Sequence, residues 1–92
     1  MSAFAPDSCP RLAPGVRLQH DRARAQWVLL APERVIELDE IAHAIVSRCD
    51  GQRPLAAIAA ELAAQFDADP AEVERDVLEL AAHLHDKRLL RA

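Results

Sequence analysis

Residues 26–40 read QWVLLAPERVIELDE, and this stretch decides the fold. Its first part, residues 26–30, is rich in strand-forming side chains. Pro32 ends that run, because proline cannot donate to a strand ladder. The extended pattern resumes over residues 35–38, and Asp39 then offers a carboxylate that can cap a helix. The stretch predicts two short strands that are joined by a tight turn and followed directly by a helix.

The strand pattern also extends toward the N-terminus. Val16, Leu18 and His20 alternate with polar residues, which is the period of a half-buried strand. We therefore expect a three-stranded antiparallel meander whose first and last strands form its edges. Leu18, Trp27 and Val28 are expected to pack the sheet onto the helices, with Trp27 as a large part of the core.

The N-terminal segment before this pattern contains three prolines and shows no usable period. Such a segment is typical of an irregular chain terminus. We expect residues 1–15 to form a flexible Pro-rich arm outside the core. Residues 16–92 are then expected to form a single domain.

Three helices are predicted after the strands. Each begins with a residue that favours a helix start: Asp39 and Asp69 can cap with their carboxylates, and Pro54 suits the first helical position. Because the strands precede the helices, the order predicts an α+β domain that is winged helix-turn-helix-like. The predicted boundaries are Asp39 to Asp50-Gly51, Pro54 to Asp67, and Asp69 to about Lys87.

The third predicted helix carries two apolar lines. The main line suits a core-facing stripe and comprises Val73, Val77, Leu80 and Leu84. The second line comprises Leu78, Ala82, His85 and Leu89. Two readings stay open for the second line: either the strands cover it, or it forms one wall of a groove.

Composition narrows the classes of function. The chain has 92 residues and a formal net charge of −4, whereas nucleic-acid binders usually carry a basic face that neutralises phosphates. No apolar run approaches the roughly 18–20 residues of a membrane span, and the N-terminus shows no secretion signal. We therefore expect a cytoplasmic protein that binds neither nucleic acid nor membrane.

No residue pattern points to catalysis, a metal or a cofactor. His83 and His85 are two apart on a predicted helix and face opposite ways, whereas helical zinc pairs need a spacing of three or four. Cys9 and Cys49 have no nearby base in the sequence to stabilise a thiolate. We therefore expect a protein that is not an enzyme, with no catalytic or metal-binding residues and no cofactor.

A DNA-binding or transcription-regulatory role is the alternative, because the helix order is shared with DNA readers. The third helix would then present four carboxylates and one arginine to phosphate, which disfavours this role. These residues are Glu72, Glu74, Arg75, Asp76 and Glu79.

The other possibility is association through residues 35–38, a short apolar edge strand. Such an edge either accepts an extended peptide as a further strand or is protected by its shortness, and it also makes a homodimer possible.

Several short motifs resemble the PqqD family. The string LLAPE at residues 29–33 is similar to the family signature L-L-x-P-E. The remaining matches are Leu38, Asp50-Gly51, Asp76-Val77, and Pro10 followed by Gly15-Val16-Arg17. Together they cover roughly residues 10–90 in register. Arg53-Pro54 departs from the polar cap that is usual in the family, which affects the start of the second helix.

The resemblance implies a peptide-recognition element of ribosomally made, modified peptides. Such a domain binds the precursor peptide PqqA as an added strand between the third strand and the third helix. It also binds the radical S-adenosylmethionine enzyme PqqE, to which it presents the peptide in pyrroloquinoline quinone biosynthesis, and it performs no chemistry itself. By position, the peptide-binding residues are Val35, Ile36, Glu37 and Leu38 of the strand, with Asp76, Val77, Leu80, Ala81 and Leu84 of the helix.

Overall fold

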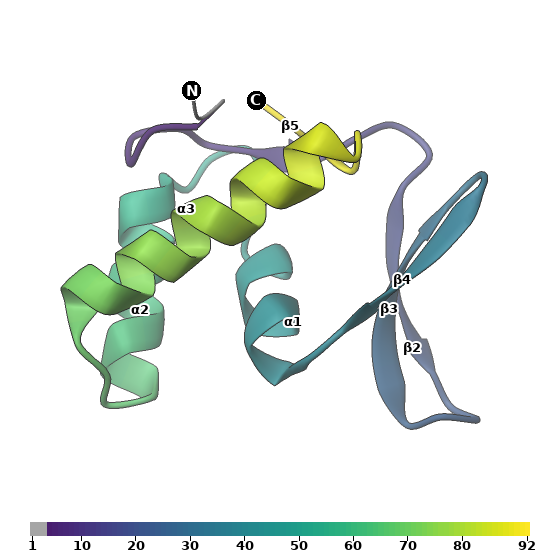
Figure 1. Cartoon of the computed structure of the whole chain (residues 1–92), viewed down its shortest axis with the longest axis horizontal. Coiled ribbons are helices and arrows are strands. Elements are labelled where there is room, and N and C mark those ends of the chain that lie inside the picture. The colour runs from purple at the N-terminus through teal and green to yellow at the C-terminus, as the bar shows by residue number, and fades with distance from the viewer. Residues whose placement is uncertain (1–3) are drawn as a thin grey trace.

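The computed structural model describes residues 4–92, in which the helices gather on one face of a small sheet (Figure 1). The order of these elements confirms the predicted α+β class, with a meander of strands followed by three helices. Two further short strands, β1 and β5, were not predicted. In chain order the elements are β1 (Arg11–Leu12), β2 (Arg17–Asp21), β3 (Gln26–Ala31), β4 (Arg34–Leu38), α1 (Glu40–Val46), α2 (Leu55–Gln65), α3 (Pro70–Asp86) and β5 (Leu90–Arg91).

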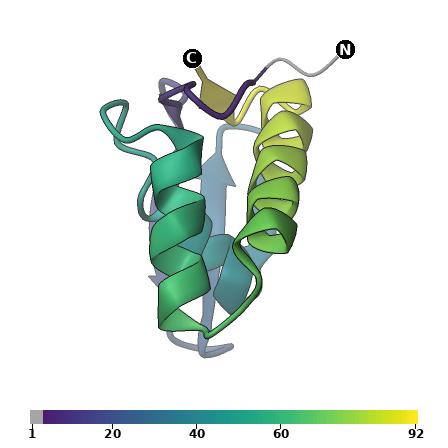
Figure 2. The same ribbon diagram turned by 90° about the vertical axis from the view of Figure 1, so that its left-hand side faces the viewer.

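The sheet is antiparallel, with the strand order β2-β3-β4. Leu29 of β3 lies opposite Leu18 of β2 and Ile36 of β4. These three side chains share the face that packs on the core. Figure 2 shows α2 and α3 side by side, with the sheet behind them. β4 is the edge strand that comes last in the sequence, and it leads directly into α1.

Trp27 does not lie in the core, which corrects our expectation. Its side chain is 37% exposed, and its ring stacks on His43 of α1. The reason is its register: Trp27 lies opposite Leu38, at the end of the sheet where α1 begins. Leu38 turns into the core there, so the indole ring covers the side of α1. Val28 is buried, but it points to the opposite face of the sheet from Leu29.

Both predicted aspartate caps are confirmed. Asp39 Oδ1 accepts a hydrogen bond from the Ala42 amide at 2.7 Å, and Asp69 Oδ1 accepts one from the Ala71 amide at 3.1 Å. Pro54 is the N-cap of α2, so the helix begins at Leu55, one position later than predicted. The α1 helix ends at Val46, before the Asp50-Gly51 turn.

The Asp50-Gly51 turn is built by one carboxylate and one glycine. Asp50 Oδ1 accepts hydrogen bonds from the amides of Gln52 and Arg53 at 2.9 and 3.0 Å. The Gln52 amide, more than the other contacts, holds the pKa of Asp50 below its ordinary value. Gly51 has a φ of +81°, which strains any residue with a Cβ.

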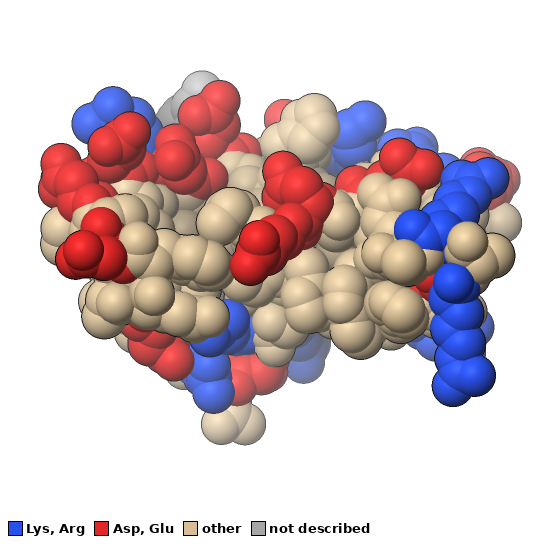
Figure 3. All heavy atoms as spheres, turned by 90° about the horizontal axis from the view of Figure 1, so that it is seen from below, with Lys and Arg blue, Asp and Glu red and all other residues tan. Residues whose placement is uncertain are grey.

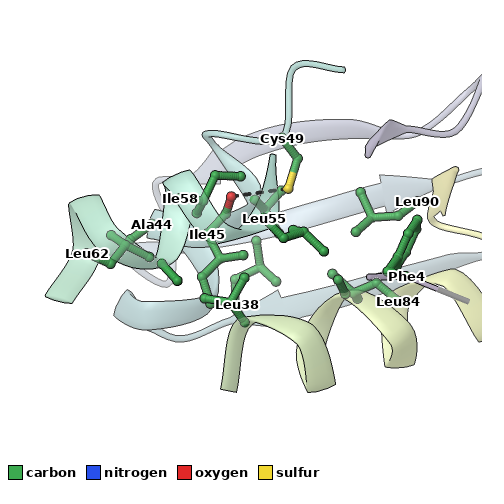
Figure 4. Close-up of a cluster of buried hydrophobic side chains, with 14 of the residues drawn as sticks. Phe4, Leu38, Ala44, Ile45, Cys49, Leu55, Ile58, Leu62, Leu84 and Leu90 are labelled. Carbon is green, nitrogen blue, oxygen red and sulfur yellow. Dashed lines mark hydrogen bonds between the residues drawn. The ribbon is translucent and has the colours of Figure 1, made fainter. Parts of the chain in front are cut away.

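The core lies between the sheet, α2 and α3 (Figure 4). Most of its large, fully buried side chains come from the three helices and β3, namely Leu29, Ile45, Leu55, Ile58, Leu62, Val77 and Leu84; Pro10 and Leu89 are the others. Cys49 is also buried, and its thiol donates a hydrogen bond to the Ile45 carbonyl at 3.3 Å. Burial, with a smaller effect from the Asp50 charge, raises the pKa of the Cys49 thiol to about 11.

The described part of the N-terminal arm is anchored to the core by Phe4 and Pro10, which are buried, so the expectation of an arm outside the core is wrong from residue 4 onward. Phe4 is only 4% exposed and packs in the core cluster, and β1 pairs with β5. The physical reason lies in α2, whose first amide groups receive no side-chain cap. The Leu55 amide donates to the Ser8 carbonyl at 2.9 Å, and the Ala56 amide donates to the Pro6 carbonyl at 2.8 Å. Residues 1–3 of the predicted arm lie outside the described residues.

Candidate functional site

β4 is one of the two edge strands of the sheet, the other being β2. Within residues 4–92 it has a strand partner on one side, which is β3. A strand at an edge presents a row of unpaired N–H and C=O groups. Val35, the second residue of this strand, is 60% exposed. The edge predicted from residues 35–38 is therefore present and is not covered by a further strand of the described chain.

The β3–β4 turn determines which backbone groups of β4 point outward. Ala31 and Arg34 flank a two-residue turn, Pro32-Glu33, and are the first pair of the ladder. Flanking residues of such a turn form a hydrogen-bonded pair, and hydrogen-bonded pairs alternate with non-hydrogen-bonded pairs along antiparallel strands. Counting from Arg34, the alternation directs the amide and carbonyl groups of residues 35 and 37 away from β3. Those of residues 34, 36 and 38 pair with β3.

The side chains of β4 alternate between the two faces of the sheet. Ile36 is half-buried against the core and Leu38 is buried in it. Val35 and Glu37 lie on the outer face, where the Glu37 carboxylate contacts the Arg24 guanidinium at 3.3 Å. Both partners of that pair are exposed, so it contributes little to stability. The β4 edge thus offers backbone groups from residues 35 and 37 and an apolar side chain from Ile36.

The side of the expected peptide site that α3 supplies, which we call the α3 wall, differs from the prediction. Val77, Ala81 and Leu84 are buried in the core, so their side chains have no free surface. Asp76 is exposed and Leu80 is half-buried at the surface. The same stripe must fill the core, which is why only its flank remains available.

Two residues of this wall were missed. A surface hollow of about 350 Å³ on α3 is lined by Asp76, Glu79, Leu80 and His83. These four positions are spaced by three, four and seven residues, so they share one helix face. That spacing was visible in the sequence and could have identified Glu79 and His83.

A second hollow, of about 420 Å³, lies between the β3–β4 turn and the C-terminal end of α3. Its lining includes three cations, Arg34, Lys87 and Arg88, and two carboxylates, Glu33 and Asp86. Acidic side chains gather over the helical end of the molecule, whereas a group of Lys and Arg projects where the sheet lies (Figure 3). These two hollows mark the surface from the β3–β4 turn to the start of α3, which we call the candidate groove. Its end at the turn is mixed and cation-rich, and its α3 side carries Asp76 and Glu79.

The candidate chemical groups are separated in the structure. His83 is exposed, whereas His85 is half-buried and packs edge-on against Phe4 with ring centroids 5.1 Å apart. Across residues 4–92, no three His, Cys, Asp or Glu side chains gather in a way that could hold a metal ion. In the same residues, no helix is long and apolar enough to cross a membrane.

Comparison with known proteins identifies the family. The family model described as Coenzyme PQQ synthesis protein D (PqqD) matches residues 26–90. The chain belongs to the PqqD family. A PqqA binding protein of Xanthomonas campestris is 65% identical over 91 residues, which cover 99% of each chain. A PqqA binding protein of Xanthomonas oryzae is 66% identical with the same coverage.

Solved structures agree with this PqqD assignment. The solution NMR structure of the PqqD truncation of Methylobacterium extorquens PqqCD is described as a functional, stand-alone recognition element for ribosomally synthesised and modified peptides. It is 44% identical, has a TM-score of 0.86, and covers 99% of this chain and 97% of that one. A lasso peptide synthetase B1 in complex with its leader peptide shares the fold, with a TM-score of 0.80, 22% identity, and coverage of 92% of this chain and 100% of that one.

The crystal structure of PqqD from Xanthomonas campestris is closer in sequence and more distant in shape. It is 63% identical, covers 98% of this chain and 100% of that one, and has a TM-score of 0.63. The lower TM-score means that its backbone is arranged differently from that of this chain. Sequence similarity within the PqqD family therefore does not determine every spatial relationship between the elements.

The PqqD signature residues have distinct structural tasks. Leu29 is fully buried, and Pro32 occupies the turn that sets the register of β4. The Gly51 amide donates to the Pro10 carbonyl at 3.0 Å, so the Asp-Gly turn holds the N-terminal segment in place. Asp76 is exposed at the α3 wall, and Val77 next to it is buried in the core. Most of the signature thus maintains the scaffold, and Asp76 faces the candidate groove.

Proposed function

We propose that this chain is a non-catalytic adaptor that binds the precursor peptide PqqA and presents it to the radical S-adenosylmethionine enzyme PqqE in pyrroloquinoline quinone biosynthesis. The observation that carries the proposal is the open edge of β4, whose turn end shares a hollow with the C-terminal end of α3. An extended peptide can add to such an edge as a further strand. The names of the Xanthomonas relatives and the recognition element of Methylobacterium extorquens support PqqA as the guest.

In this proposal the guest strand pairs with the backbone of residues 35 and 37. Ile36 and Leu80 supply apolar contact, while Asp76 contacts the guest from the α3 side. Glu79 and His83 join the wall because they line the same surface hollow. Four of the residues that were predicted to bind peptide lie beneath this surface and support it from the core: Leu38, Val77, Ala81 and Leu84.

Presentation to PqqE follows from tethering. A peptide held on an adaptor that also binds the enzyme reaches an effective concentration of roughly millimolar at the enzyme, if the geometry allows both contacts. The chain contributes no reacting group in this scheme. The raised pKa of Cys49 supports a non-catalytic role for that thiol, because only the thiolate is a good nucleophile. Two free cysteines also support a cytoplasmic location.

The surface of α3 supports a peptide as the guest in preference to DNA. Glu72, Asp76 and Glu79 are exposed beside Arg75, and Glu74 is half-buried. Carboxylates that outnumber cations repel phosphate. The same open edge can pair with its copy in another molecule, so a homodimer is part of the proposal.

An amide-shift titration tests the proposal. The ¹⁵N-labelled chain is titrated with the synthetic PqqA peptide encoded in the same genome. We expect the largest shifts at residues 35–38 and at Leu80, Glu79 and His83. Shifts confined to other surfaces would overturn edge pairing. For presentation, PqqE with PqqA is assayed with and without the chain, and equal rates in both would overturn the adaptor role.

A further inference from the structure

An apolar hollow of about 240 Å³ lies where α1 begins, α2 ends and α3 begins. Its lining includes two of the four large hydrophobic side chains that are exposed in the described residues, Ile41 at 45% and Phe66 at 37%. Large apolar side chains that stay exposed together mark a binding surface.

The hollow has an apolar floor and an acidic rim. Ile45, Leu62 and Val77 form the floor and are almost fully buried. The two charged lining residues, Glu72 and Asp76, are both acidic and exposed. A ligand that fits is therefore apolar where it enters and cationic beside that point.

The hollow adjoins the α3 side of the candidate groove. Asp76 lines it and also lines the surface hollow formed with Leu80 and His83. Ile41 lies in the first turn of α1, three residues after the last residue of β4. A strand that pairs with β4 and runs beside α3 thus reaches the hollow at the end of the groove.

The volume suits one large side chain. A cavity of roughly 150 Å³ with aliphatic walls holds a benzene ring, and the hollow is larger, at about 240 Å³. It is open on one side to exposed residues, so an aromatic or large aliphatic side chain can enter without a change in the fold.

We propose that this hollow binds one large apolar side chain of the guest peptide, an anchor that lies next to a Lys or Arg of the same peptide. The cation pairs with Asp76 or Glu72, and the anchor contacts Ile41 and Phe66. This inference rests on the proposed peptide-binding function. It requires that the guest carry a large apolar residue next to a cation. It also places that part of the guest near the start of α3, because the opposite end of the candidate groove is rich in cations.

The test measures affinity for synthetic PqqA by isothermal titration calorimetry. The variant Ile41→Ser removes an exposed contact and leaves the floor intact, and we expect about tenfold weaker binding. An alanine scan of the large apolar residues of PqqA identifies the anchor. Its alanine variant loses a similar factor, and combining it with Ile41→Ser gives little further loss. Thermal unfolding of each variant verifies that the chain is folded.

The charge requirement has its own variant pair. Asp76→Lys is expected to weaken PqqA binding, and a PqqA peptide whose cation beside the anchor is changed to Glu restores it. Asp7→Lys makes the same charge change on the exposed part of the N-terminal arm and serves as the control. We expect this control to leave the affinity for PqqA unchanged.

Failure of the inference is distinguishable from failure of the proposed function. If Ile41→Ser binds PqqA as the parent does while residues 35–38 still shift, the hollow is not the anchor site and edge pairing stands. If PqqA shifts neither region, the proposed function itself fails. If Ile41→Ser weakens the complex with PqqE and not with PqqA, the hollow belongs to the enzyme interface and the inference is overturned.

Discussion

Trp27 stacks on His43, with ring centroids 4.2 Å apart and ring planes 15° from parallel. Trp27 also meets His20 edge-on, at 5.0 Å between ring centroids. The three rings come from β2, β3 and α1. The indole ring therefore connects the sheet to the first helix from outside the core, beside the point where β4 enters α1.

Removing the stacked partner is expected to expose the indole. We expect His43→Ala to shift the fluorescence emission of Trp27 to longer wavelength. The free energy of unfolding should fall by about 1 kcal/mol, since aromatic pairs contribute on that order beyond their buried area. His83→Ala removes an exposed histidine of α3 and is the control. An emission spectrum that His43→Ala leaves unchanged would contradict the stacking seen here.

Phe4 is expected to stabilise the fold as a core residue. Phe4→Ala should lower the free energy of unfolding by about 3 kcal/mol, which is typical of a buried phenylalanine. Phe66→Ala makes the same chemical change at a side chain that is 37% exposed, and should cost clearly less. Urea unfolding measures both. Equal losses for the two variants would mean that the arm does not pack as described.

The strands and helix caps could be predicted because they depend on local patterns. Alternating side chains, Pro32 and the two aspartate caps act within a few residues of themselves. The ordering of the arm could not be predicted in this way, because it depends on partners about 50 positions along the chain. The amides of Leu55 and Ala56 find carbonyl groups at Ser8 and Pro6. The one local signal was Pro54, a cap residue without a side-chain acceptor.

The candidate site could be predicted in part, where it depends on local sequence patterns. The open edge at residues 35–38 follows from strand order, and the sequence indicates that order. The α3 residues of the site came by position from the family resemblance, and Val77 and Ala81 among them are fully buried. A stripe read from sequence does not distinguish a core face from a groove face, because both are apolar. The polar flank at Asp76 and His83 marks the accessible side.

Cys49 gives a pH dependence whose sign can be derived. The pKa of its thiol rises from 9.0 in the ordinary state to about 11 in the folded chain. The unfolded chain therefore loses its proton first, and the unfolded state gains stability as the pH rises above about 9. The contribution of Cys49 is fully present below about pH 9 and is lost as the pH rises through 11.

The size of that loss is about 2–3 kcal/mol between the two limits. Urea unfolding of the parent and of Cys49→Ala at about pH 8 and about pH 10.5 measures it. We expect the parent to lose more stability than Cys49→Ala over this range, whatever their difference at the lower pH. Cys9→Ala should behave as the parent does. If the stability of the parent and of Cys49→Ala fell in parallel with pH, burial of the Cys49 thiol would be ruled out as the cause of the pH dependence.

Single prolines along β4 distinguish its outward from its inward amides. Glu37→Pro removes an outward N–H, so PqqA affinity should fall about tenfold while the fold is kept, since edge strands tolerate proline where the N–H faces solvent. Ile36→Pro removes an amide paired with β3 and should destabilise the hairpin. Glu37→Ala is the matched control, because it keeps the amide and loses only the exposed contact with Arg24. Backbone pairing requires Glu37→Pro to bind PqqA more weakly than Glu37→Ala, and equal affinities would exclude it.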